Sequence, residues 1–265
     1  STSGGDDMRQ ASPAKYKCES IDQLALVVND VELVAKNYWD ILGIGPWAIY
    51  EWEAPLVFDR KYHGETVWAR EKIAIVQVGR LELEVVQFVD GPSVYRDWIK
   101  ARGEGLHHMK FVVDDVDEVS GILASEGFHC IQSEKFGPPG GGGGVAYFDV
   151  KPLRAIWEPV QNAEGLDVKP LMFPDTAAGS PAKHLCTDIN HIAIAVNDVE
   201  IVAKNYWDIL WIGPWKIDEW EAPLAYDRTY RGERAWARDK TAHAQVGEME
   251  LELVLTRVVC EEAVE

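Results

Sequence analysis

Histidine and glutamate side chains recur at corresponding places in different parts of the sequence. A histidine stands near the head of an apolar, strand-like run at His108 and again at His191. Glutamates stand among apolar neighbours in later strand-like runs, at Glu84, Glu158 and Glu252. An unpaired carboxylate is expensive to bury in such surroundings, so these groups should meet a partner. Imidazole and carboxylate groups are suited to proton transfer and to metal binding.

These positions correspond because the sequence repeats itself. Residues 21–86 reappear at 189–254, 168 residues later, with about two thirds of the positions identical. The match extends back to Ser12 and Cys18, which correspond to Ser180 and Cys186. Long identical strings indicate a recent duplication.

The elements that must position these side chains follow one order. Residues 21–88 predict a strand, a helix capped by Asp30 and ended by Gly43, and three further strands. A more divergent unit follows with the same order, and the third unit copies the first. We therefore expect module 1 with a connecting helix at 12–104, module 2 at 105–161, a linker at 162–188 and module 3 at 189–256.

The number of units is odd, and each has an apolar sheet face that another layer must cover. Module 3 could pack against module 2, against its equivalent in a homodimer, or against a domain of a longer parent protein.

Composition limits the function classes. The chain has 265 residues, a formal charge of −18 and 47% hydrophobic residues, as expected for a globular protein. Nucleic acid is not an expected partner, because phosphate binding needs clustered Lys and Arg. No apolar run is long enough for a membrane span, so we expect a cytoplasmic protein without a membrane partner. Four scattered cysteines predict reduced thiols rather than a zinc cluster or disulfides.

Together with the segments 29–30, 43–47 and 103–108, these strands resemble the vicinal oxygen chelate superfamily. This superfamily includes glyoxalases, bleomycin resistance proteins and dioxygenases, and the sequence is most similar to its methylmalonyl-CoA epimerase-like branch. The resemblance implies an α+β fold in which paired βαβββ modules form a cupped mixed sheet around a divalent metal ion. The Gly-Leu-His-His strand start at 105–108 is its most specific motif.

The resemblance also implies a ligand set. His108 and Glu158 would come from module 2, and Glu84 from module 1. Module 1 has Gln23 where a histidine is usual, and an amide is a weaker ligand than imidazole for softer metals. Module 3 keeps His191, so pairing modules 2 and 3 would instead combine His108 and Glu158 with His191 and Glu252. The sequence does not distinguish among six candidate metals: cobalt, nickel, manganese, zinc, magnesium and iron.

This reading predicts a metal-dependent epimerase, isomerase or lyase. It would act on a small carbonyl or acyl-CoA substrate through a metal-stabilised enolate. Glu158 or Glu84 would act as the base if its metal coordination is incomplete. One alternative is a protein that binds a small molecule without chemistry. Another is a ring-cleaving dioxygenase, which usually needs two histidines and one carboxylate.

Other residues support narrower expectations. Trp47, Arg60 and Tyr62 could line the cup and contact substrate, although a turn held by Asp59 and Arg60 is an equal alternative. Strand alternation predicts opposite faces for the neighbours His107 and His108 and a shared face for Glu82 and Glu84.

Trp211 replaces Gly43 in the copy, which predicts a different helix exit. The glycine run 140–144 is interpreted as a hairpin loop.

Overall fold

The computed structural model describes residues 11–138, 142–175, 179–221 and 227–258, and glycines 140 and 141 of the expected loop lie outside these ranges. None of the helices in these ranges has the length and apolar character needed to cross a membrane. Module 1 comprises β1 (Gln23–Val28), α1 (Val31–Leu42), β2 (Trp47–Trp52), β3 (Val57–Tyr62), β4 (Glu65–Thr66), β5 (Arg70–Val78), β6 (Leu81–Asp90) and the connecting helix α2 (Val94–Arg102).

Modules 2 and 3 follow in the same βαβββ order. Module 2 comprises β7 (Gly105–Val112), α3 (Val116–Ser125), β8 (Cys130–Phe136), β9 (Gly143–Val150), the 3-10 turn η1 (Lys151–Leu153) and β10 (Ala155–Gln161). The short strand β11 (Leu171–Phe173) lies in the linker. Module 3 comprises β12 (His191–Ala195), α4 (Val199–Leu210), β13 (Lys216–Trp220), β14 (Thr229–Tyr230), β15 (Glu233–Arg234), β16 (Ala237–Val246) and β17 (Met249–Val258).

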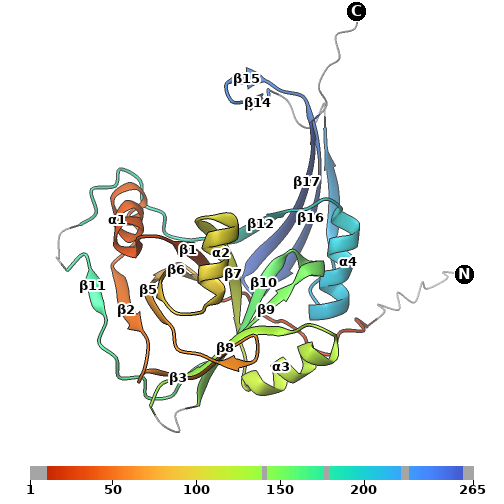
Figure 1. Cartoon of the computed structure of the whole chain (residues 1–265). Coiled ribbons are helices and arrows are strands. Elements are labelled where there is room, and N and C mark those ends of the chain that lie inside the picture. Colours follow the sequence, from red (N-terminus) through yellow and green to blue (C-terminus); the bar gives the residue numbers. More distant parts are fainter. Residues whose placement is uncertain (1–10, 139–141, 176–178, 222–226, 259–265) are drawn as a thin grey trace, which may run out of the picture.

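Modules 1 and 2 share one mixed sheet, whereas module 3 forms its own (Figure 1). The shared sheet has the order β11-β2-β5-β6-β1-β7-β10-β9-β8-β3-β4, and the antiparallel pair β1 and β7 joins the modules. Strand β3 leaves module 1 and pairs with β8 of module 2, which ties the two ends of the cup together. The expected α+β fold of paired βαβββ modules is therefore confirmed.

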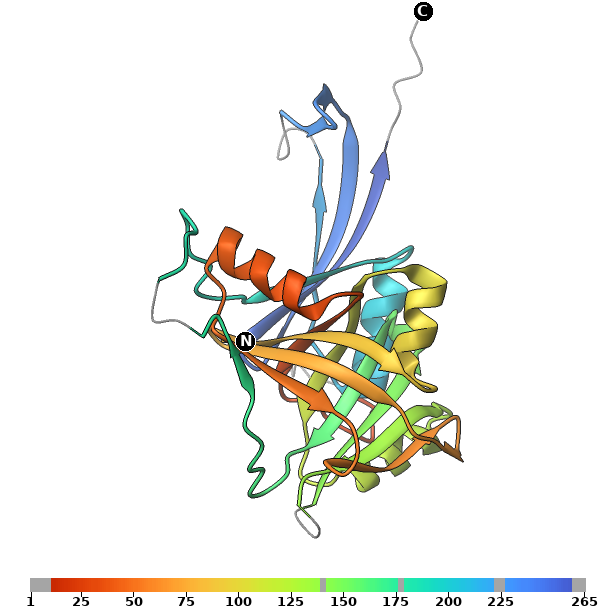
Figure 2. The ribbon, with the colours of Figure 1, turned by 60° about the vertical axis from the view of Figure 1, so that its left-hand side comes forward.

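Helices α1, α3 and α4 cover the outer faces of these sheets, whereas α2 packs on the inner face through Val94 and Tyr95 (Figure 2). Helix α1 packs its buried Val31 and Ala35 into the core of module 1, against β2, β5 and β6. A second continuous core joins α3 and the strands of module 2 to α4 and the strands of module 3. In this core, Trp157 and Tyr206 are fully buried, with their rings 6.0 Å apart. Module 3 thus packs against module 2 without entering its sheet.

Modules 1 and 3 also exchange their leading segments. The Cys18 amide donates to the Leu210 carbonyl at 2.9 Å, and the equivalent Cys186 amide donates to the Leu42 carbonyl at 2.8 Å. The equivalent hydroxyls of Ser12 and Ser180 donate to the carbonyls of Trp207 and Trp39. The segment before each copy therefore caps the helix end of the other copy.

The expectation that Trp211 gives module 3 a different helix exit was wrong. Trp211 adopts the left-handed conformation with φ 54°, as Gly43 does with φ 69°. The following amide of Ile212 donates to the carbonyl of Tyr206 at 3.1 Å, and the Ile212 side chain is buried. A non-glycine residue in the left-handed conformation costs only about 1–3 kcal/mol. The hydrogen bond and the burial of Ile212 can offset that cost, so α4 ends in the same way as α1.

Candidate functional site

The site lies where the two modules meet in the shared sheet. Ala25 on β1 is opposite Glu84 on β6 and opposite His108 on β7. Lys110, two residues after His108, is opposite Glu158 on β10. Residues that are directly opposite, or two apart on one strand, share a face of a sheet. The register therefore directs one histidine and two carboxylates into the cup.

These three side chains are buried and in contact. His108 Nε2 lies 3.0 Å from Glu158 Oε2 and 3.5 Å from Glu84 Oε2. Burial alone would lower the pKa of His108, but Glu158 and Glu84 together raise it to about 9. Burial raises the pKa of Glu84, and the charge of Glu158 adds to this against the opposing effect of His108. In the absence of another cation, the cluster therefore favours an imidazolium between the carboxylates.

Gln23 and an ion pair flank this cluster. Gln23 is 2% exposed and lines the same cavity. Lys110 Nζ lies 2.6 Å from Glu82 Oε1. Burial would lower the pKa of Lys110, but Glu82 raises it above its usual value. Glu82 and Glu84 share a strand face as expected: Glu84 contacts His108, whereas Glu82 neutralises a lysine that the sequence analysis missed.

The cavity inside the cup has a volume of about 240 Å³. Carboxylate and amide groups lie along its floor, and aromatic rings form much of its wall. The Tyr95 and Tyr147 hydroxyls are hydrogen-bonded at 2.7 Å, and burial raises the pKa of both well above its usual value. The aromatic lining residues are Tyr50, Trp52, Tyr95, Phe136 and Tyr147. Such a cavity suits a small molecule with a polar end.

The two adjacent histidines do not alternate across the sheet as expected. Leu106 is opposite Leu26 and His108 is opposite Ala25, so His107 is an extra residue in a β-bulge. Both rings are buried, with Nδ1 of His107 2.8 Å from Nδ1 of His108. The bulge lets both imidazoles lie beside each other, which a regular strand would prevent.

The structure gives Arg60, Tyr62 and Trp47 different surroundings. Arg60 is buried behind the cavity wall and contacts Glu71 at 2.7 Å and Glu134 at 2.6 Å. Tyr62 donates to Asp97 and lines a separate groove. Trp47 is fully buried in the core of module 1 and does not line the cavity. Contact between Trp47 and a substrate is therefore not supported, because its ring completes the packing under α1.

His191 and Glu252 of module 3 lie in the other sheet, 2.9 Å apart. The His191 side chain is 42% exposed, whereas Gln23, its equivalent in module 1, is buried. His243 lies nearby, with Nδ1 3.1 Å from Glu250 Oε1. The side chains that meet inside one cup are thus those of modules 1 and 2.

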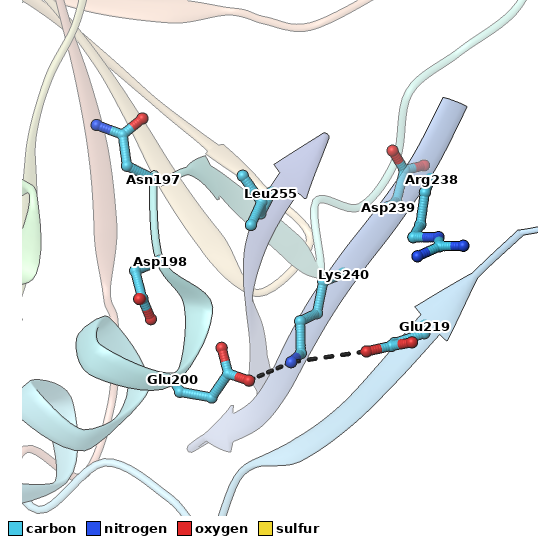
Figure 3. Close-up of a pocket in the computed structure, with 8 residues that line it drawn as sticks. All are labelled: Asn197, Asp198, Glu200, Glu219, Arg238, Asp239, Lys240 and Leu255. Carbon is cyan, nitrogen blue, oxygen red and sulfur yellow. Dashed lines mark hydrogen bonds and ion pairs between the residues drawn. The ribbon is translucent and has the colours of Figure 1, made fainter. Parts of the chain in front are cut away.

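A smaller hollow on module 3 is lined by charged side chains (Figure 3). Lys240 points between Glu200 and Glu219, and its Nζ lies 3.7 Å from Glu219 Oε1. Module 1 repeats this arrangement with Lys72, Glu32 and Glu51. Because the charges satisfy each other in both copies, the hollow has a structural explanation.

Comparison with known proteins points to one superfamily. Residues 22–147 match the model of the Glyoxalase/Bleomycin resistance protein/Dioxygenase superfamily, so this part of the chain is similar to that superfamily. A mutant of 4-hydroxymandelate synthase from Streptomyces coelicolor has a similar fold, with a TM-score of 0.56 at 14% identity over 92% of this chain and 65% of the synthase. The chain thus covers less than two thirds of that synthase.

Two further structures are similar over about half of the chain. Methylmalonyl-CoA epimerase from Mycobacterium tuberculosis has a TM-score of 0.40 and 18% identity, over 57% of this chain and 92% of the epimerase. A hypothetical protein from Bacillus halodurans has a TM-score of 0.41 and 22% identity, over 55% of this chain and 95% of its own. No curated protein matches the sequence.

Proposed function

We propose that the cup formed by modules 1 and 2 is the active site of a metal-dependent epimerase, isomerase or lyase. Its substrate would be a small carbonyl or acyl-CoA compound that loses a proton from the carbon beside a carbonyl group. The observation that supports this most is the buried contact of His108 with Glu84 and Glu158, two carboxylates that line a small cavity. An imidazole and two carboxylates in such a place are costly to bury unless they act together.

The donor set suits a divalent ion. One imidazole, two carboxylates and the amide of Gln23 would provide ligands for a hard or intermediate metal. Nε2 of His108 faces both carboxylates, 3.0 Å from Glu158 Oε2 and 3.5 Å from Glu84 Oε2, so an ion held there would replace the proton between them. In the described ranges, no three His, Cys, Asp or Glu side chains already have the arrangement of a metal site. When bound, the ion would supply a Lewis acid for a substrate oxygen.

The chain's own residues would move the proton and exclude water. Glu84 makes the longer contact with His108, 3.5 Å against 3.0 Å for Glu158, so its carboxylate is the less tightly held of the two. We assign Glu84 to accept the proton from carbon and Glu158 to remain beside His108. The rings of Tyr95 and Tyr147 close the wall next to both carboxylates. A base in such a position contributes about 10²–10⁴-fold to the rate of proton transfer.

Metal analysis by plasma mass spectrometry, on protein purified without chelator, tests this proposal. We expect near-stoichiometric metal in the unchanged protein, loss in His108→Ala, and retention in His191→Ala, the matched change in module 3. Gln23→His should bind the metal about tenfold more tightly, since imidazole is the stronger ligand. Loss of metal in His191→Ala as well would instead place module 3 at the site.

Proton exchange tests the chemistry separately. With an acyl-CoA probe in D₂O, and with the metal content of the two proteins matched, Glu84→Gln should exchange the proton beside the carbonyl at least about 100-fold more slowly than the unchanged protein. Exchange that is unchanged in Glu84→Gln would exclude this residue as the base.

Binding of a small molecule without chemistry is the second candidate function. Two observations favour it: Gln23 replaces a stronger ligand, and five aromatic side chains line the cavity. Protein that stays metal-free after incubation with divalent ions would support it. Dioxygenase chemistry has less support, because its second histidine would be His191, which lies in the other sheet.

A further inference from the structure

We propose that a second groove, beside α2, binds an organic anion with an oxyanion head and an apolar body. The groove has a volume of about 720 Å³ and lies between α2, the start of β7, the turn η1 and strand β12. Modules 1, 2 and 3 therefore all contribute to its walls. It shares no lining residue with the cup cavity: His108 lines the groove, whereas its partners Glu84 and Glu158 line the cup cavity.

Unpaired cations line this groove in a strongly acidic protein. Arg102, Lys151 and Arg154 border it, and none of them forms an ion pair within the described ranges, although the Arg102 guanidinium lies 4.3 Å from the centre of the Trp98 ring. The chain as a whole has a formal charge of −18. Two carboxylates also line the groove. Asp97 is already bonded to Tyr62 and Arg96, which leaves the carboxylate of Asp149 at the edge.

Two buried nitrogen atoms in the lining lack partners. His107 is 3% exposed, and its Nε2 has no hydrogen-bond partner. Trp98 Nε1 is also buried and has no partner, and an indole nitrogen can only donate. The two rings lie 4.9 Å apart at an edge-to-face angle of 72°. A buried donor without an acceptor costs about 1–3 kcal/mol, so the pair should meet a ligand.

The contact between the histidines decides the role of His107. One proton lies between the two Nδ1 atoms, which are 2.8 Å apart. Each ring uses its Nδ1 in this contact, so Nε2 of His107 is the ring nitrogen that is left to meet a ligand in the groove.

These features select the chemistry of the ligand. An indole donor without an acceptor, beside positive charge, favours an oxyanion such as a phosphate, carboxylate or sulfonate. Around them the lining is apolar, so the rest of the ligand should be an apolar or aromatic body. The apolar lining residues outside α2 are Leu106, Met109, Ile131, Ala155, Ile156, Ala193, Ile194 and Ala195.

Calorimetric titration of the full chain with phenyl phosphate tests this inference. We expect one molecule to bind per chain, and binding to weaken about tenfold or more in the double variant Lys151→Glu, Arg154→Glu. Trp98→Phe keeps the ring but removes the donor, and it should weaken binding several-fold. Lys183→Glu is the matched control, because Lys183 is exposed and outside the groove. It should bind within about twofold of the unchanged protein.

Three outcomes would overturn the inference: no binding to the unchanged protein, equal weakening in Lys183→Glu, or unchanged binding in both groove variants. Because Trp98→Phe preserves charge and shape, it also gives an answer if the double variant does not fold. The titration is repeated after removal of metal with a chelator. Binding should persist, so this inference and the proposed metal site can fail independently.

Discussion

Arg60 is shared between two carboxylates in the wall behind the cup. Its guanidinium contacts Glu71 and Glu134, and all three side chains are buried. One cation cannot neutralise two carboxylates. Burial raises the pKa of Glu71 to about 7; Arg60 opposes this shift and the charge of Glu134 adds to it. Glu71 should therefore titrate near neutral pH in the folded protein.

The variant Glu71→Gln should remove a pH dependence of stability. Folded Glu71 keeps its proton up to about pH 7, whereas the unfolded group releases it near the usual glutamate pKa of 4.5. The folded protein thus binds more protons between these values, and its free energy of unfolding falls as the pH rises through this window. Relative to Glu71→Gln, we expect the unchanged protein to lose about 1–3 kcal/mol between pH 5 and pH 8. Urea unfolding across this range measures the difference, and a constant difference would contradict the argument.

At the scale of elements, the sequence predicted most strands and helices but not the irregular ones. Alternation and helical spacing located α1 and the start of β7 closely, because these depend on local pattern. The bulge at His107 depends on how β7 pairs with β1, so no local pattern shows it. Likewise β3 is fixed by its distant partner β8.

The candidate site could be predicted only in part for the same reason. Motif and register pointed to His108, Glu84 and Glu158, and these side chains do lie together. Lys110 also had a signal, since it is two residues from His108 on the same strand face. Tyr95 and Tyr147 gave no comparable signal, because their positions in the wall depend on tertiary packing.

The end of helix α4 offers a test of backbone strain. Trp211 takes the left-handed conformation that Gly43 takes at the end of α1. Glycine adopts this conformation without the cost to a side chain, so Trp211→Gly should raise the free energy of unfolding by about 1 kcal/mol. In the reverse change, Gly43→Trp, a side chain would be placed on a residue with φ 69° and would displace the exposed end of Leu185. That variant should be destabilised, and denaturant unfolding compares the two. A loss of stability in Trp211→Gly would show that the indole's packing outweighs the strain.

At the scale of the molecule, two nearly identical units have different neighbours. Module 2 covers the inner face of module 1, and Gln23 there is 2% exposed. The corresponding face of module 3 is open at His191. Meanwhile the outer faces of modules 2 and 3 share one core, and the segments before modules 1 and 3 are exchanged. The repeat predicts each unit, but the environment of each depends on contacts among all three.

The pair Tyr206 and Tyr38 tests how much the contact between modules 2 and 3 contributes to stability. Tyr206 is fully buried, and its hydroxyl donates to the Leu153 carbonyl at 2.8 Å, which joins α4 to η1. Tyr206→Phe would leave that carbonyl without a partner, so we expect the free energy of unfolding to fall by about 1–2 kcal/mol. Tyr38 is the same residue in α1 but is only partly buried, and Tyr38→Phe should change stability by less than about 0.5 kcal/mol. Urea unfolding of both variants provides the comparison. An equal fall in the free energy of unfolding for both variants would mean that the tyrosine hydroxyl stabilises each module by itself and not the contact between modules 2 and 3.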